Sequence, residues 1–146
     1  MNFMFTKAKA DLLSKQLDFG LDDLRMLLVM TNTTIATQED IATLGAATVL
    51  DEFVGAGYTS PGVAMTTKTV QQDNINNRGE FHADNVAFGA LGTAVRAIQG
   101  AVLYKFVTSL ALSQPIAYID TGGFPLVTNG AAVTVIKHAE GWVQTT

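Results

Sequence analysis

The sequence predicts a mainly β protein: a single-domain, jelly-roll-like β-sandwich with a short N-terminal helix. Three observations predict it. Short segments rich in Val and Thr alternate with turns that contain Gly, Pro or Asn, one segment shows strict period-two alternation, and helix formers dominate only at the start. The 146 residues have the length of one ordinary domain. We therefore expect a single domain over 1–146, with 1–20 as an N-terminal helical arm and 139–146 as a C-terminal tail.

The first predicted element is an amphipathic helix over residues 3–17. Thr6 is the candidate N-cap, because a hydroxyl side chain can accept a hydrogen bond from a free N–H group of the first turn. Ala8, Leu12 and Leu13 supply its apolar positions. This pattern gives the helix one face to bury.

The strands follow. Residues 24–30 are a nearly continuous apolar run of strand length, although helix is the competing interpretation because Leu and Met are good helix formers. Residues 38–50 are ambiguous. In 97–107, apolar residues alternate with period two, as in a strand. The other predicted strands are 51–54, 63–70, 85–88, 116–120, 124–127 and a last strand at 131–136.

Two segments are expected to be turns or loops. Residues 71–84 are polar and are predicted to form an exposed loop. Asn129-Gly130 is a strong signal for the turn of a β-hairpin. The chain would then finish in the short tail that contains Trp142.

Composition excludes several classes of protein. There is no cysteine, so disulfides and cysteine-ligated zinc are excluded. A net charge of −4 argues against a generic nucleic-acid binder. The apolar runs are too short to span a membrane, so we expect synthesis in the cytoplasm and no membrane partner. Charged residues make up only 15% of the chain, against roughly 25% in typical soluble domains. This shortage predicts that other chains cover part of the surface.

The residues needed for chemistry are scarce. His82 and His138 are the only histidines and lie far apart in the chain, so we expect no metal site. The carboxylate pairs Glu39-Asp40 and Asp51-Glu52 are neighbours in sequence, which in a strand turns them to opposite faces. No nucleophile elbow or phosphate-binding loop is present. We therefore predict no cofactor and no enzymatic activity.

Three aromatic residues lie near the termini, outside the clear strands: Phe3, Phe5 and Trp142. They either cap the core or anchor a neighbouring chain, since aromatic side chains are enriched at interface centres. Both interpretations stay open at this point. The other aromatics on or near predicted strands are expected in the core: Phe81, Phe88, Tyr104, Phe106 and Tyr118.

Five segments taken in order resemble a known family. They are Phe-Thr-Lys-Ala-Lys at 5–9, Leu-Arg-Met-Leu-Leu-Val at 24–29, Glu-Phe-Val-Gly-Ala-Gly-Tyr-Thr at 52–59, Ala-Val-Leu-Tyr-Lys at 101–105 and Pro-Ile-Ala-Tyr-Ile-Asp at 115–120. Their order and spacing are similar to those of small structural proteins of tailed bacteriophage particles.

The resemblance implies a virion component without catalysis, most like a capsid decoration or cement protein. Its expected partners are the major capsid protein and copies of itself, as a dimer or trimer, with Phe3, Phe5 and Trp142 as clamps. A neck or tail component is one alternative, and a fibre-like receptor or carbohydrate-binding module is another. A small lyase or isomerase on a jelly-roll scaffold would need more metal-ligating histidines than the chain has.

Overall fold

The structure is a computed structural model, and it describes residues 2–145. In chain order the elements are β1 (Phe3–Met4), α1 (Thr6–Leu13), β2 (Leu24–Met30), the 3-10 helices η1 (Ile35–Thr37) and η2 (Leu44–Ala46), β3 (Val63–Ala64), β4 (Thr69–Asp73), β5 (Arg78–His82), β6 (Val86–Ala90), β7 (Ile98–Lys105), β8 (Gln114–Ile119), β9 (Ala132–Val135) and β10 (Val143–Thr145).

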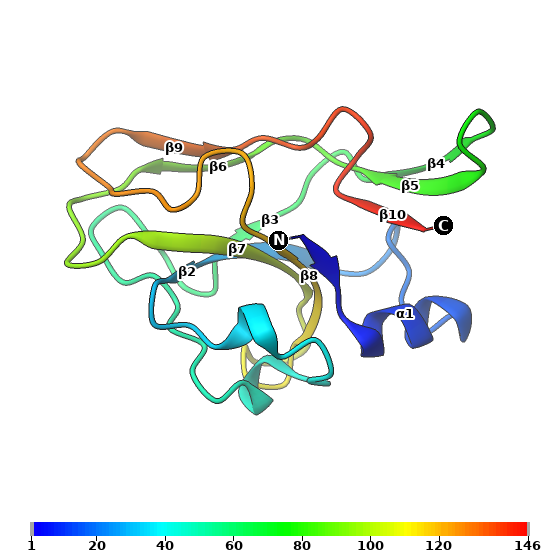
Figure 1. Cartoon of the computed structure of the whole chain (residues 1–146), viewed down its shortest axis with the longest axis horizontal. Helices are drawn as coiled ribbons and strands as arrows, with labels where there is room; N and C mark the ends of the chain where they lie inside the picture. Colours follow the sequence, from blue (N-terminus) through cyan, green and yellow to red (C-terminus); the bar gives the residue numbers. More distant parts are fainter. Residues whose placement is uncertain (1, 146) are drawn as a thin grey trace.

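The strands form three antiparallel sheets. The largest has five strands in the order β1-β8-β7-β2-β3, and the two smaller ones have the orders β10-β5-β4 and β6-β9. Figure 1 shows both small sheets on one side of the five-stranded sheet, with α1 and the two 3-10 helices on its other side. The prediction of a mainly β protein with a short N-terminal helix is confirmed.

The core lies on both faces of the five-stranded sheet. Successive residues of a strand point to opposite faces, yet Met26, Leu27, Leu28 and Val29 in β2 are all fully buried. Both faces of this strand are therefore covered, which explains why its sequence is a continuous apolar run and shows no alternation. The predicted strand over 24–30 is confirmed with these bounds.

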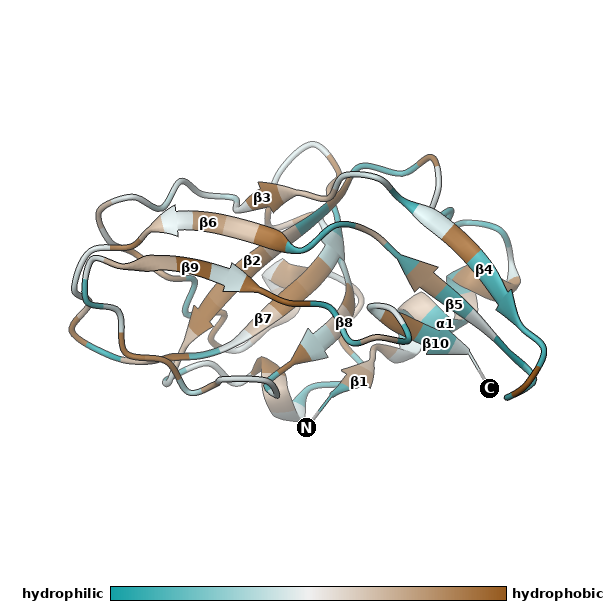
Figure 2. Cartoon of the chain, turned by 90° about the horizontal axis from the view of Figure 1, so that it is seen from above, coloured by the Kyte–Doolittle hydropathy of each residue, from teal (hydrophilic) through white to brown (hydrophobic). Residues whose placement is uncertain are grey.

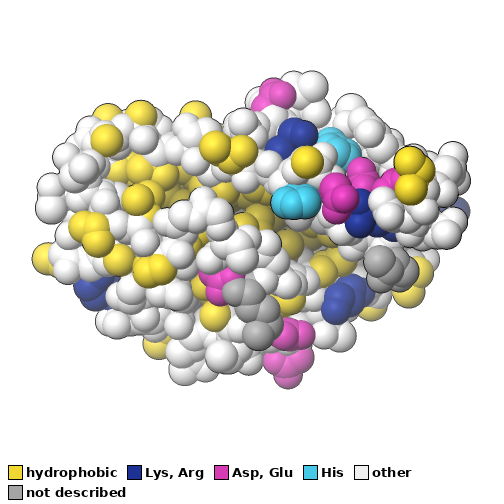
Figure 3. All heavy atoms as spheres, turned by 45° about the horizontal axis from the view of Figure 1, so that its top comes forward, with side chains coloured by type: hydrophobic (Ala, Val, Ile, Leu, Met, Phe, Trp, Pro, Cys, Tyr) yellow, Lys and Arg dark blue, Asp and Glu magenta, His cyan; other side chains and the backbone are white. Residues whose placement is uncertain are grey.

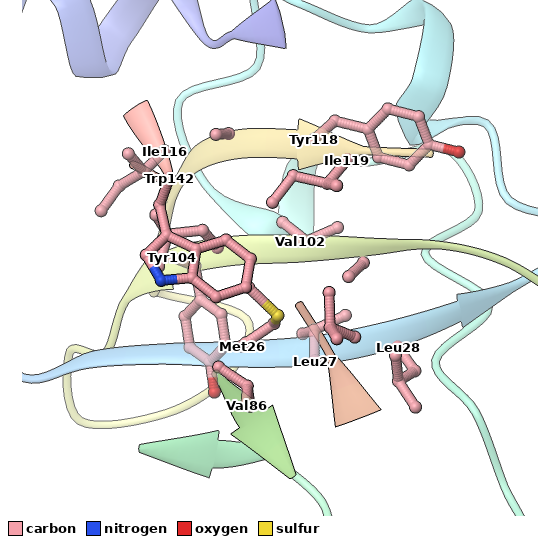
Figure 4. Close-up of a cluster of buried hydrophobic side chains, with 14 of the residues drawn as sticks. Met26, Leu27, Leu28, Val86, Val102, Tyr104, Ile116, Tyr118, Ile119 and Trp142 are labelled. Atoms are coloured by element: carbon pink, nitrogen blue, oxygen red, sulfur yellow. The ribbon is translucent and has the colours of Figure 1, made fainter. Parts of the chain in front are cut away.

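The small sheet β6-β9 covers the core from one side only. Val86 and Phe88 in β6 are buried, whereas Ala87 between them is exposed, as the period-two pattern predicts. Figure 2 shows β6 and β9 with brown, hydrophobic bands above β2 and β7. Side chains from both layers form one buried cluster that includes Val86, Met26 and Trp142 (Figure 4).

The prediction of an exposed loop over 71–84 is wrong, because most of this segment belongs to the hairpin β4–β5. Residues 69–72 of β4 are all exposed, so this strand lacks the alternation of buried apolar and exposed polar residues that predicts a strand from sequence. The turn is instead built by Asp73, whose Oδ1 accepts hydrogen bonds from the N–H groups of Ile75 and Asn76 at 2.9 and 3.2 Å. The local sequence signal for this hairpin is therefore the aspartate turn and not a hydrophobic pattern.

The termini are built into the sheets, which corrects the predicted arm and tail. Residues 3–4 form the edge strand β1, so the helix begins only at Thr6 and ends at Leu13; Phe5 is its N-cap. Leu13, expected on the buried face, is 88% exposed. Residues 143–145 of the predicted tail form β10, so 131–136 does not contain the last strand.

Two smaller expectations also differ from the structure. The predicted strand 63–70 is interrupted, and its two ends belong to different sheets as β3 and β4. The Asn129-Gly130 turn joins no hairpin, because β9 pairs with β6, whereas the preceding segment only forms a bridge from Leu126 to Ile98. A turn signal specifies local geometry but not the partner of the strand that follows.

Candidate functional site: a groove between the two chain ends

A groove of about 500 Å³ lies between β1 and β8 on one side and the segment from β9 to β10 on the other. Both chain ends therefore line it. Its apolar lining comes mainly from Phe3, Met4, Ile119, Ile136, Trp142 and Val143, and its polar lining from Asn2, Thr121, Lys137, His138 and Gln144. Figure 3 shows hydrophobic side chains in a hollow of the surface, with both histidines and several charged side chains on its right.

The N-terminal wall is an edge strand of the large sheet. In β1, Phe3 pairs with Tyr118 and Met4 with Ala117, and the N–H group of Phe5 donates to the carbonyl of Ile116 at 2.9 Å. Because main-chain groups alternate in direction along a strand, those of Met4 face the unpaired edge. This wall thus offers a free N–H and C=O beside an apolar surface.

The C-terminal wall depends on a tight turn at Gly141. Its φ is +93°, and its N–H donates to the carbonyl of His138 at 3.0 Å. A Cβ at this position would lie 2.5 Å from the carbonyl oxygen of Phe81, so a side chain has no room. The turn delivers Trp142 into the core, with its main-chain N–H donating to that same oxygen at 2.8 Å. Glycine is required here for both reasons.

Two of the three predicted terminal aromatics line the groove, and the third lies in the core behind one of them. Phe3 and Trp142 both line the groove, the first partly exposed and the second 9% exposed. Phe5 is 0% exposed and stacks edge-on against Phe3, with ring centroids 4.9 Å apart. Phe5 is therefore a core residue, which corrects the expectation that it acts as an interface clamp.

Trp142 retains an unsatisfied donor. Its Nε1 is buried and has no hydrogen-bond acceptor among the described residues. Buried indole N–H groups usually have a partner. The hydroxyl of Tyr118, which also lines the groove, is likewise buried without a partner among the described residues, so a ligand that carries an acceptor could satisfy either donor.

Sequence reasoning missed the largest exposed apolar side chain of the groove. Ile136 follows β9 and is 73% exposed. A signal was present, since Ile136 shares the alternating face of Thr134, opposite Val133 and Val135. An isoleucine on the polar face of a strand is informative, because large apolar residues there add nothing to the core.

Ion pairs fasten the C-terminal wall to the hairpin β4–β5. The Arg78 guanidinium lies 2.9 Å from a carboxylate oxygen of Glu140 and 2.9 Å from one of Glu80, and donates to Oε1 of Gln144 at 3.2 Å. The hydrogen bond from Arg78 is the main reason that the pKa of Glu140 lies below its ordinary value. The network holds the segment before β10 in place by charge-assisted hydrogen bonds.

The histidines do not come together as a metal centre. Nε2 of His82 lies 2.9 Å from Glu80, whereas His138 is exposed, with Nδ1 3.9 Å from Glu140. Within residues 2–145 no group of three or more His, Asp or Glu side chains is placed to hold a metal ion.

The neighbouring carboxylates Asp51 and Glu52 have separate partners. Asp51 accepts two hydrogen bonds from the Arg96 guanidinium, at 2.6 and 2.7 Å. Glu52 accepts from the hydroxyls of Tyr58 and Ser60, at 2.7 and 2.9 Å. Burial is the main cause that raises the pKa of the Tyr58 phenol. These contacts tie loops to the sheet and leave the two carboxylates facing different groups.

Much apolar surface lies outside the groove as well. Within the described part of the chain, large hydrophobic side chains with at least 40% exposure are Leu13, Leu21, Val49, Val54, Val70, Ile75, Val95, Val107, Leu112, Val127 and Ile136. They are spread over the helix, the loops and the strand edges. Single exposed apolar residues are common, but this set belongs to a chain with few charges.

Comparisons with protein-family models, with curated proteins and with solved structures found no match. Among residues 2–145, the helices are too short or too polar to cross a lipid bilayer.

Proposed function

We propose that this protein is a non-enzymatic structural component of a tailed-bacteriophage particle, where it binds the capsid exterior as a decoration or cement protein. Its partners are the major capsid protein and further copies of itself, and its place is the virion. We interpret the three sheets as a jelly-roll-like β-sandwich that serves as a rigid body for these contacts.

The observation that carries the proposal is the exposed apolar surface in a chain with only 15% charged residues. Burying such side chains against a partner contributes roughly 25 cal/mol per Å² of apolar surface. A partner that binds only the assembled lattice stabilises that lattice by mass action. Many copies with modest interfaces would together hold adjacent capsid subunits in place.

The groove between the chain ends is the surface that we assign to the capsid protein. Its walls carry the unpaired edges of β1 and β10, and its lining is apolar. An extended segment of the capsid protein fits such a site, because its main chain can pair with a strand edge while an alternate side chain enters the groove. Trp142 lies in the same groove with an unsatisfied donor for a carbonyl of that segment.

Particles that lack this chain provide the test, since purified protein can be added back to them. We expect saturable binding by the natural chain and at least a tenfold loss for Ile136→Asp, because the groove would then have to bury a carboxylate. Val95→Asp is the matched control: Val95 is 97% exposed and lies outside the groove. Equal binding by Ile136→Asp and the natural chain would contradict the assignment of the groove.

A carbohydrate-binding module and a neck or tail component are the two alternative functions. A carbohydrate-binding module needs exposed aromatic platforms, yet Tyr104, Tyr118 and Trp142 are all buried. A neck or tail component would use the same kind of protein surface in a ring of few copies. Copy number therefore separates it from a shell protein.

A further inference from the structure

We infer that two copies of this chain pair through the free edge of β4, antiparallel, about a twofold axis at Gln71. The proposed occupant of this edge is a second copy. The inference is independent of capsid binding: a chain that pairs in this way and never binds a particle would refute the proposed function and leave the pairing intact.

β4 is exposed to solvent. It is the outer strand of the three-stranded sheet, and Thr69, Val70, Gln71 and Gln72 are exposed although they alternate between its two faces. Both faces and one edge of the strand are thus open to solvent. Figure 2 shows β4 along the outer margin of the molecule, where a neighbour can approach.

The hydrogen bonds of β5 determine the direction of the main-chain groups of β4. The Phe81 carbonyl accepts from Trp142, and the Gly79 N–H donates to Oγ1 of Thr145, so Phe81 and Gly79 direct their main chains to β10. Their partners in β4 are Val70 and Gln72. In an antiparallel ladder, such non-hydrogen-bonded partners direct their own groups away from each other. The N–H and C=O groups of Val70 and Gln72 therefore face the free edge.

β4 lacks most of the features that protect a free strand edge. Natural proteins protect exposed edges with lysine, proline, bulges or very short strands. β4 contains no lysine or proline, its one charged residue, Asp73, is its last residue, and its five residues pair with β5 without a register shift. The edge strands β1 and β3 have only two residues each, β10 has three, and β9 has four, and the pairing of β6 with β9 contains a register shift. Among the described edges, β4 is thus the long and regular one.

The free edge of β4 is complementary to itself. With Gln71 opposite Gln71 of the second copy, Val70 lies opposite Gln72 in both directions, and the two reciprocal pairs satisfy all their outward main-chain groups. Asp73, the charged residue of the strand, lies opposite Thr69 and meets no like charge. The pairing also shields Val70, which is 63% exposed in the single chain. The result is one continuous six-stranded sheet across the pair.

The natural chain contains no cysteine, so single cysteines report the register without interference. In the proposed pair, the two residues at position 71 form a non-hydrogen-bonded pair with Cα atoms about 4.5 Å apart, which a disulfide can bridge. The two residues at position 72 lie diagonally, roughly 9 Å apart from a strand rise of about 3.4 Å per residue, which is too far. We expect oxidised glutathione to convert Gln71→Cys largely into a covalent dimer, with at least fivefold less dimer for Gln72→Cys.

Sedimentation of the natural chain supplies the noncovalent test. We expect a monomer–dimer equilibrium, and its loss in Val70→Pro, because proline removes an outward N–H without removing a hydrogen bond to β5. Circular dichroism establishes that the variant is folded. Equal cross-linking of the two cysteine variants would overturn the inference. A natural chain that stays monomeric up to about 1 mM would also overturn it and would indicate that the edge of β4 binds a different protein.

Discussion

Replacing Phe5 and Phe3 separately by alanine tests how the N-terminal segment is divided between core and surface. The two residues lie two positions apart and stack on each other, but Phe5 is fully buried and Phe3 is partly exposed in the groove. Truncating a fully buried phenylalanine costs about 3–5 kcal/mol. For Phe3 we expect about half the transfer free energy of a buried aromatic, roughly 1–1.5 kcal/mol. Each variant also loses the shared ring contact.

These free energies are large against the total stability of a domain, about 5–15 kcal/mol. With a slope of roughly 3 °C per kcal/mol for a chain of this size, Phe5→Ala should lower Tm by roughly 9–15 °C and Phe3→Ala by roughly 3–5 °C. Urea unfolding followed by the fluorescence of the single tryptophan, Trp142, measures both losses. Comparable losses in the two variants, or a larger loss for Phe3→Ala, would refute the assignment of Phe5 to the core.

Two further predictions concern the C-terminal wall of the groove. Gly141→Ala should lower the free energy of unfolding in urea more than Gly130→Ala does. Both glycines have a positive φ, which costs a residue with a side chain about 1–3 kcal/mol of strain, but only at Gly141 would a Cβ also meet a carbonyl oxygen, at 2.5 Å. Equal losses in the two variants would show that this close approach is unimportant. For pH, the pKa of Glu140 is lower in the folded protein than its ordinary value of 4.5, mainly through the hydrogen bond from Arg78. This contribution to stability is therefore complete above that value and is lost as the pH falls through the lower, folded pKa. Arg78→Gln should remove this contribution, so the free energy of unfolding should fall less steeply between about pH 5 and pH 3. The pKa of Glu140 should rise in an NMR titration of the variant. An unchanged pKa would contradict the pairing of Arg78 with Glu140.

Sequence patterns predicted the strands whose own side chains determine which of their faces are buried. The run 24–30 is strand β2, and residues 98–105 of the predicted segment 97–107 are strand β7, because their apolar side chains specify buried faces directly. The hairpin β4–β5 was missed because its exposed first strand has no apolar face, and its stability comes from pairing and from the Asp73 turn. β1 and β10 were missed because two or three residues carry no period; they are strands only since β8 and β5 offer edges to pair with.

The candidate site could be predicted only in part for the same reason. The sequence singled out Phe3 and Trp142, but a single sequence contains no information on which edge strands lie opposite each other. Their meeting in one groove depends on the β1–β8 and β10–β5 pairings, which join residues more than 60 positions apart. Phe5 differs from Phe3 only through the closure of α1 and the sheet over its ring, which composition and spacing do not reveal.

The most direct measurement of the central claim is the number of copies of this chain in purified phage particles, determined by quantitative mass spectrometry and located by electron microscopy. A decoration protein requires on the order of hundreds of copies on the outer surface of the shell, because each lattice position binds one. We expect that number of copies at that location. A chain absent from the shell exterior, or present in only about six or twelve copies at the neck or tail, would contradict it.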